Sequence, residues 1–131
     1  MSTAVLRASG TNFDVDAFLR RSSGIRPDNV WHRGDAALHG RVRNESGFAA
    51  PVAEADDGEE VVMRVFSFLG GCSKLITDLA ASGAASVIDV SLEVGSGVHY
   101  ASSIRFGPDV LRRLAELSVG LEISGYPVSD E

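Results

Sequence analysis

The stretch that decides the fold is Ser86-Val87-Ile88-Asp89-Val90-Ser91-Leu92-Glu93-Val94. Four apolar residues, at positions 88, 90, 92 and 94, alternate with Asp89, Ser91 and Glu93. Alternation with a period of two places one set of side chains on each side of a strand, so this strand has one buried face and one wet face. A sheet that is wet on one side is typical of antiparallel pairing with helices packed on the other side.

The residues after this strand continue the same pattern. Gly95-Ser96-Gly97 predicts a turn, and the turn would make a hairpin between 86–94 and a second strand over 98–106. Pro108 at a first helical position predicts a helix to about Ser118, because the fixed φ of proline suits the start of a helix. A last strand is expected over 121–126.

The N-terminal part predicts a second group of elements. Strands are expected over 3–9, 29–33 and 47–53, with a short helix over 15–21 that Asp14 caps, and residues 36–45 form a loop without regular structure. From 58 to 82 apolar residues recur at helical spacing, and Gly70-Gly71 interrupts them. Since glycine costs about 1 kcal/mol inside a helix, we expect a kink or a break there.

Together these elements predict a single α+β domain over residues 1–131. Its expected form is a two-layer structure with a mainly antiparallel sheet of about six strands and helices on one face. The predicted order is β-α-β-β-α-β-β-α-β. The first six elements match the order of a ferredoxin-like half, and a β-α-β extension follows them.

Composition and charge exclude several classes of protein. The 131 residues are 44% hydrophobic and have a net charge of −6, the balance of an ordinary globular protein. Residues 1–50 hold seven arginines against five carboxylates, whereas residues 51–131 hold five basic groups against thirteen acids. This acidic part would repel nucleic acid and anionic membranes, so we expect neither as a partner. No leader-like segment follows Met1 and no apolar run reaches about 20 residues, which predicts a cytoplasmic protein.

No group of residues has the spacing of a catalytic or metal site. His32, Asp35 and His39 are of the right types for metal ligands, but their spacing does not match helical ligation, and Cys72 is far away in sequence. Cys72 is expected to be a buried, inert thiol. Gly95-Ser96-Gly97 lies between predicted strands and so cannot supply the helix N-terminus of a phosphate loop. We therefore expect no catalytic residue, cofactor or metal.

One segment is rich in residues that binding surfaces use. Residues 24–35 contain the only tryptophan beside a turn proline, arginines, a histidine and a Gly-Asp corner. The predicted ligand- or partner-binding residues are Arg26, Trp31, His32, Arg33, Asp35, Arg41 and Arg43. Alternatively, Trp31 fills the core and the arginines are solvated or paired with Asp28, Asp35 and Glu45.

Several segments resemble those of the bacterial domain-of-unknown-function family 4279. These are Phe13-Asp14-Val15, Gly24-Ile25-Arg26-Pro27, Trp31-His32-Arg33-Gly34-Asp35, Gly47-Phe48, Phe106-Gly107-Pro108 and the closing 121–126. Phe48 departs from the pattern, because that family tends to have Gly-Trp at this point. The resemblance covers nearly the whole chain and implies an α+β fold with no established activity.

We expect from these observations a non-catalytic cytoplasmic binding protein that contacts a protein partner, with an immunity or accessory role in view. The alternative is a binder of small anionic metabolites, or an enzyme, that uses the Trp31-His32-Arg33 corner with Arg41 or Arg43 as an anion clamp. A third hypothesis is a domain that acts by self-association through an exposed sheet edge, as a homo-oligomer.

Overall fold

The computed structural model describes residues 1–95 and 103–127. Within these ranges the chain forms five strands and four α-helices in the order β-α-β-β-α-α-β-α-β. The strands are β1 (Ser2–Gly10), β2 (Asn29–Trp31), β3 (Ser46–Ala55), β4 (Ala85–Val94) and β5 (Val119–Pro127). The helices are α1 (Val15–Arg21), α2 (Gly58–Gly71), α3 (Ser73–Ala81) and α4 (Pro108–Glu116), with a single 3-10 turn at Leu38–Gly40.

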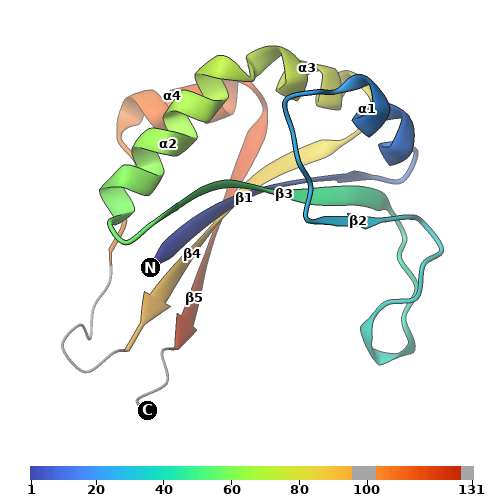
Figure 1. Cartoon of the computed structure of the whole chain (residues 1–131), viewed down its shortest axis with the longest axis horizontal. Coiled ribbons are helices and arrows are strands. Elements are labelled where there is room, and N and C mark those ends of the chain that lie inside the picture. Colours follow the sequence, from blue (N-terminus) through green and yellow to red (C-terminus); the bar gives the residue numbers. More distant parts are fainter. Residues whose placement is uncertain (96–102, 128–131) are drawn as a thin grey trace.

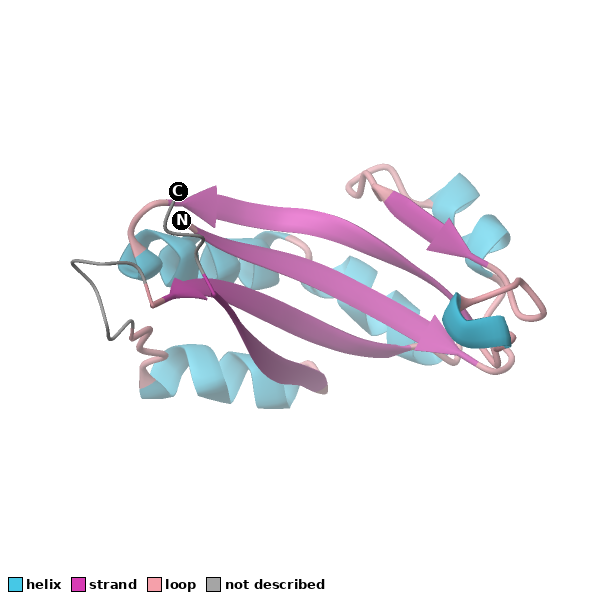
Figure 2. Ribbon diagram, turned by 90° about the horizontal axis from the view of Figure 1, so that it is seen from below, coloured by secondary structure: helices cyan, strands magenta, loops and turns pink. Residues whose placement is uncertain are grey.

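The strands form one mixed sheet in the order β2-β3-β1-β4-β5. All neighbours are antiparallel except β4 and β5, which are parallel and are joined through α4. β3 lies between β1 and β2, and β1 lies between β3 and β4, an interleaved arrangement of split β-α-β units. The four helices cover one face of this sheet (Figure 1), and the opposite face is uncovered when the molecule is turned (Figure 2).

The core lies between the helices and the sheet. Alternate residues of β1, among them Leu6, are fully buried, and Ile88 of β4 lies beside Leu6 in the ladder. Phe18 of α1 stacks on Phe48 of β3 with ring centroids 5.9 Å apart, and Phe13 packs at their edge. The alternation predicted over 86–94 is confirmed, because β4 has one buried face and one face that is open to solvent.

The predicted break at Gly70-Gly71 is confirmed. α2 ends at Gly71, and Cys72 separates it from α3. Cys72 is partly exposed rather than buried, so that part of the prediction was wrong. Cys72 lies at the junction of α2 and α3.

The predicted hairpin over 86–106 was wrong in its described part. Residues 96–102, which include most of the predicted turn, lie outside the described residues, and 103–106 are not in a strand. β4 has β1 on one side and β5 on the other, so the sheet has five strands instead of about six. A period of two shows which side chains are buried but does not distinguish a parallel from an antiparallel neighbour. Here the neighbour is β5, which follows α4 and is parallel to β4.

In residues 1–95 and 103–127, every helix is too short or too polar to cross a bilayer.

Candidate functional site

Trp31 lies at the edge of the sheet, on the face that the helices leave uncovered. It ends β2 and pairs with Gly47 of β3, which pairs in turn with Ser9 of β1. The indole lies against Gly47: a Cβ atom there would be 2.8 Å from Cζ2 of Trp31 and 2.5 Å from the carbonyl oxygen of Ala8. Trp31 is partly exposed, so it does not fill the core, which uses phenylalanines instead.

Arg43 lies over the indole of Trp31. Its guanidinium carbon lies 5.1 Å from the centre of the Trp31 ring, within the range of a cation–π contact. Ser9, Trp31, Arg43, Asn44 and Glu45 line a hollow of about 250 Å³ beside this pair. The hollow has both a guanidinium and a carboxylate on its wall, so it suits a small polar group better than a large apolar ligand.

His32 contacts two carboxylates, one on α1 and one three residues further along the chain. Its Nε2 atom lies 3.0 and 2.9 Å from the two carboxylate oxygens of Asp16 on α1, and its Nδ1 lies 3.6 Å from Oδ2 of Asp35. The backbone N–H of His32 also donates to Asp35 at 2.8 Å. Hydrogen bonding to Asp16 and the negative charge of that carboxylate raise the pKa of His32 above 6.5, with a smaller contribution from Asp35.

Residues 32–45, which we name the arm, form an irregular hairpin instead of the structureless loop expected over 36–45. Gly34 N–H donates to Arg43 O at 2.9 Å, Arg43 N–H to Asp35 O at 2.8 Å, and Ala37 N–H to Arg41 O at 2.8 Å. The tip is the 3-10 turn, where His39 has a positive φ of 62°. The arm projects beyond the sheet at the lower right of Figure 1. These backbone hydrogen bonds hold the two sides of the arm together.

The arm exposes apolar side chains between cations. Leu38 is 82% exposed and Val42 is 58% exposed. Arg41 and Arg43, on either side of Val42 in sequence, are also exposed. A solvated pair of large aliphatic side chains on a structured projection is a feature of surfaces that contact another molecule.

The remaining predicted site residues serve different parts of the structure. Arg33 extends back to the body of the domain, where Nη1 donates to Thr11 O at 3.4 Å, while its backbone N–H donates to Ser46 Oγ at 2.9 Å. Arg26 is exposed between α1 and β2 and makes no hydrogen bond or ion pair with the described part of the chain. The structure thus groups Trp31 with Arg43 and His32 with Asp35, and leaves Arg26 apart. Sequence reasoning missed Asp16, because nothing near position 16 indicates a partner sixteen residues away.

Among residues 1–95 and 103–127, no group of three His, Cys, Asp or Glu side chains is arranged to hold a metal ion. The Asp16, His32 and Asp35 side chains form a linear pair of contacts through one imidazole, in which both ring nitrogens face a carboxylate.

Comparison with known families decides where the chain belongs. The family model described as "Domain of unknown function (DUF4279)" matches residues 1–128. The chain is a member of the DUF4279 family. The resemblance expected from the sequence is confirmed, and no curated protein and no solved structure match the chain.

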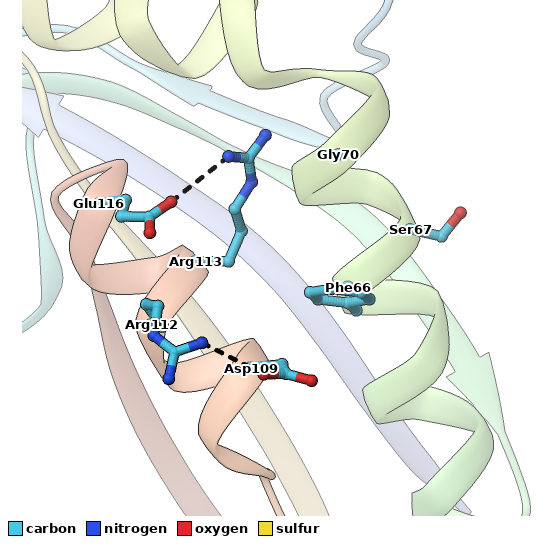
Figure 3. Close-up of a pocket in the computed structure, with 7 residues that line it drawn as sticks. All are labelled: Phe66, Ser67, Gly70, Asp109, Arg112, Arg113 and Glu116. Carbon is cyan, nitrogen blue, oxygen red and sulfur yellow. Dashed lines mark hydrogen bonds and ion pairs between the residues drawn. The ribbon is translucent and has the colours of Figure 1, made fainter.

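This DUF4279 chain has a second hollow, which the sequence did not indicate. It has a volume of about 520 Å³ and lies between α2 and α4 (Figure 3). Phe66 points from α2 toward α4, where Arg112 pairs with Asp109 at 3.3 Å and Arg113 with Glu116 at 3.5 Å. Both arginines of the hollow are therefore paired within their own helix.

Proposed function

We propose that this DUF4279 chain is a non-catalytic, cytoplasmic binding protein that recognises a protein partner with its arm, in an immunity or accessory role. The observation that carries the proposal is the 82% exposure of Leu38 at the tip of a hydrogen-bonded projection. An aliphatic side chain in that position gains free energy only when another surface covers it.

The arm is organised before it binds. Three backbone hydrogen bonds join its two sides, and the contact of His32 with Asp16 fastens its base to α1. A surface that is already ordered loses less conformational entropy when a partner binds. This supports a binding role for the arm.

The charges around the arm indicate the chemistry of the partner. Leu38 and Val42 supply apolar contact, and the exposed residues Arg41 and Arg43 flank Val42 in sequence. A matching surface would have an apolar depression bordered by carboxylates, because arginine recognises carboxylates by paired hydrogen bonds. Residues 51–131 have an excess of acids and would repel a partner surface that is itself bordered by carboxylates. This repulsion would favour approach of the partner from the side of the arm.

The test places a photo-crosslinking amino acid at position 38 of the full chain, in lysate of the native host. The matched control carries the same group at Met63, an apolar residue of α2 that is also strongly exposed. We expect a cross-linked protein band from position 38 and not from 63. Excess wild-type chain should compete this band away, and excess Leu38→Asp chain should not. A band common to both positions, or no band from position 38, contradicts the proposal.

The hollow beside Trp31 supports a second candidate, a binder of small anionic metabolites. Arg43 on its wall could pair with a carboxylate or phosphate, with the indole against the body of the ligand. A thermal-shift screen with carboxylated and phosphorylated metabolites tests this candidate. If this candidate is correct, a metabolite should raise the melting temperature of the wild-type chain. The increase should be lost in Arg43→Gln and kept in Arg41→Gln.

A further inference from the structure

β5 is an open edge of the sheet. It is nine residues long and pairs in continuous register with β4 over its whole length, and within the described residues it has no neighbour on its other side. Proteins usually protect such an edge with a short strand, a bulge, a lysine or an internal proline. The opposite edge, β2, is three residues long, but β5 contains no lysine and its only proline is its last residue. Within residues 1–95 and 103–127, the outer N–H and C=O groups of β5 therefore pair with no other strand.

Apolar side chains follow this edge on the helix-covered side. Ile123 lies beside the buried Val90 in the ladder, which places it on that side, and yet it is 50% exposed. It is the middle residue of β5, with Leu121, partly buried, on the same side of the strand. An aliphatic side chain, that of Ile123, is therefore exposed to solvent at the middle of the β5 edge.

α4 extends the same apolar surface. Asp109, Arg112 and Glu116 line its side toward α2, and at 100° per residue Leu111 and Ala115 lie on the opposite flank. Leu111 is 46% exposed. α2 packs over β3 and β1, whereas α4 packs over β5, so the flank that faces away from α2 points past the open edge. Leu111 and Ile123 therefore belong to one strip along the β5 edge.

We infer that β5 pairs antiparallel with β5 of a second copy of this chain, across a two-fold axis at Ile123. Because Ile123 is the midpoint of Val119–Pro127, this register gives all nine residues a partner. It places Ile123 on Ile123 of the second copy, on the side where the two α4 flanks also meet. Directly opposite antiparallel side chains are close enough to pack.

The other side of the pair is compatible with the same register. Glu122 would lie opposite Ser124 of the second copy, and Tyr126 opposite Gly120, where an aromatic ring can cover a glycine. The neighbouring register centred on Glu122 would set two carboxylates directly opposite each other, which is destabilising. A register shifted by one residue would turn the helix-covered side of one copy toward the uncovered side of the other.

The pairing joins two five-stranded sheets and leaves the arms at the two far ends, since β2 is the opposite edge of each sheet. It is independent of the function proposed for the arm, but would present two arms to a partner at once. Each copy has a net charge of −6, so the copies repel each other at long range. Salt screens this repulsion, and association should be tighter at high ionic strength.

Sedimentation velocity of the full chain over a range of concentrations tests the inference. We expect a monomer–dimer equilibrium that shifts toward dimer as salt is raised. Ile123→Lys should raise the dissociation constant by about tenfold or more, because it removes the central apolar contact and sets two cations opposite each other. Val30→Lys, an exposed apolar position on the opposite edge, should leave it unchanged. Circular dichroism of the dilute variants checks that each is folded.

A cross-link provides a second measurement that does not depend on weakening the strand. In a Cys72→Ser background, Ile123→Cys should form a disulfide-linked dimer under mild oxidation, because the two β-carbons would face each other across the axis. Val30→Cys should not. A chain that sediments as a monomer at every concentration, an association that Ile123→Lys leaves unchanged, or equal cross-linking of both cysteine variants would overturn the inference.

Discussion

The indole of Trp31 rests directly on the backbone of Gly47, and only a glycine leaves room for it. An added Cβ at Gly47 would lie 2.5 Å from the carbonyl oxygen of Ala8 and 2.8 Å from Cζ2 of Trp31. The first of these is a backbone atom of the central strand, so it has little freedom to move. The glycine therefore leaves room for the indole of an edge-strand tryptophan against β3.

Gly47→Ala should destabilise the domain by about 1–3 kcal/mol, since the new methyl group overlaps fixed atoms. Urea unfolding measures this change, and fluorescence of the single tryptophan should shift as the indole is displaced. Gly70→Ala is the matched control. Its added methyl group meets nothing within 4 Å and lies in α2, so that variant should be more stable, by about 0.5–1 kcal/mol. Equal effects of the two substitutions would contradict the packing described here.

The contact between His32 and Asp16 should make the free energy of unfolding depend on pH. Asp16 raises the pKa of His32 in the folded chain, so the protonated imidazole stabilises the fold. This stabilisation is fully present below the unfolded value of 6.5 and is lost as pH rises through the higher folded pKa. We expect the free energy of unfolding to fall above pH 6.5, and an NMR titration of the His32 ring to have its midpoint above 6.5.

Asp16→Asn is the variant that isolates this effect. It keeps an amide side chain on α1 but removes the carboxylate, whose hydrogen bond and negative charge are the two largest causes of the raised pKa of His32. The titration midpoint of His32 should move down, and the decline in stability above pH 6.5 should become shallower. An unchanged midpoint would show that the contact with Asp16 is not made in solution.

The two sequence patterns that proved most informative were local ones. Asp14 was expected to cap α1, and its carboxylate accepts from Ala17 N–H at 3.0 Å. The alternation over 86–94 identified the buried and wet faces of β4. Both depend on residues close to each other in sequence, where helix and strand geometry alone decide what a side chain can contact.

What the sequence did not predict depends on distant partners. The direction of β5 beside β4 follows from α4, and the alternation of β4 is the same for either direction. The contact between His32 and Asp16 arises because α1 packs over the sheet near the end of β2, and no spacing in the sequence indicates it. The grouping of Trp31 with Arg43 follows from the arm folding back on itself, where only a loop was expected.

Arg7 should stabilise the fold through ion pairs on the uncovered face of the sheet. It forms an ion pair with Asp89 of β4 at 3.2 Å and another with Glu122 of β5, so one cation lies between two carboxylates. Arg7→Gln would leave these carboxylates side by side. Because Arg7 and Glu122 are well exposed, we expect a loss of only about 0.5–1 kcal/mol, reduced at high salt. Urea unfolding at two salt concentrations checks this, with Arg64→Gln on α2 as a variant that removes an exposed helical pair.

Arg43 should hold the arm against the sheet through Trp31. Arg43→Ala removes the cation–π contact at 5.1 Å and exposes one side of the indole, so tryptophan fluorescence should shift to longer wavelength. The loss in global stability should be small, about 0.5–1 kcal/mol, because the contact is at the surface.

Hydrogen exchange should change more, since the Gly34 N–H donates to the carbonyl of Arg43 and exchanges when the arm opens. Arg41→Ala is the matched control, because Arg41 lies nearer the tip and its side chain makes no hydrogen bond or ion pair with residues 1–95 or 103–127. Faster exchange at Gly34 in both variants, or in neither, would mean that the indole and the guanidinium do not secure the arm.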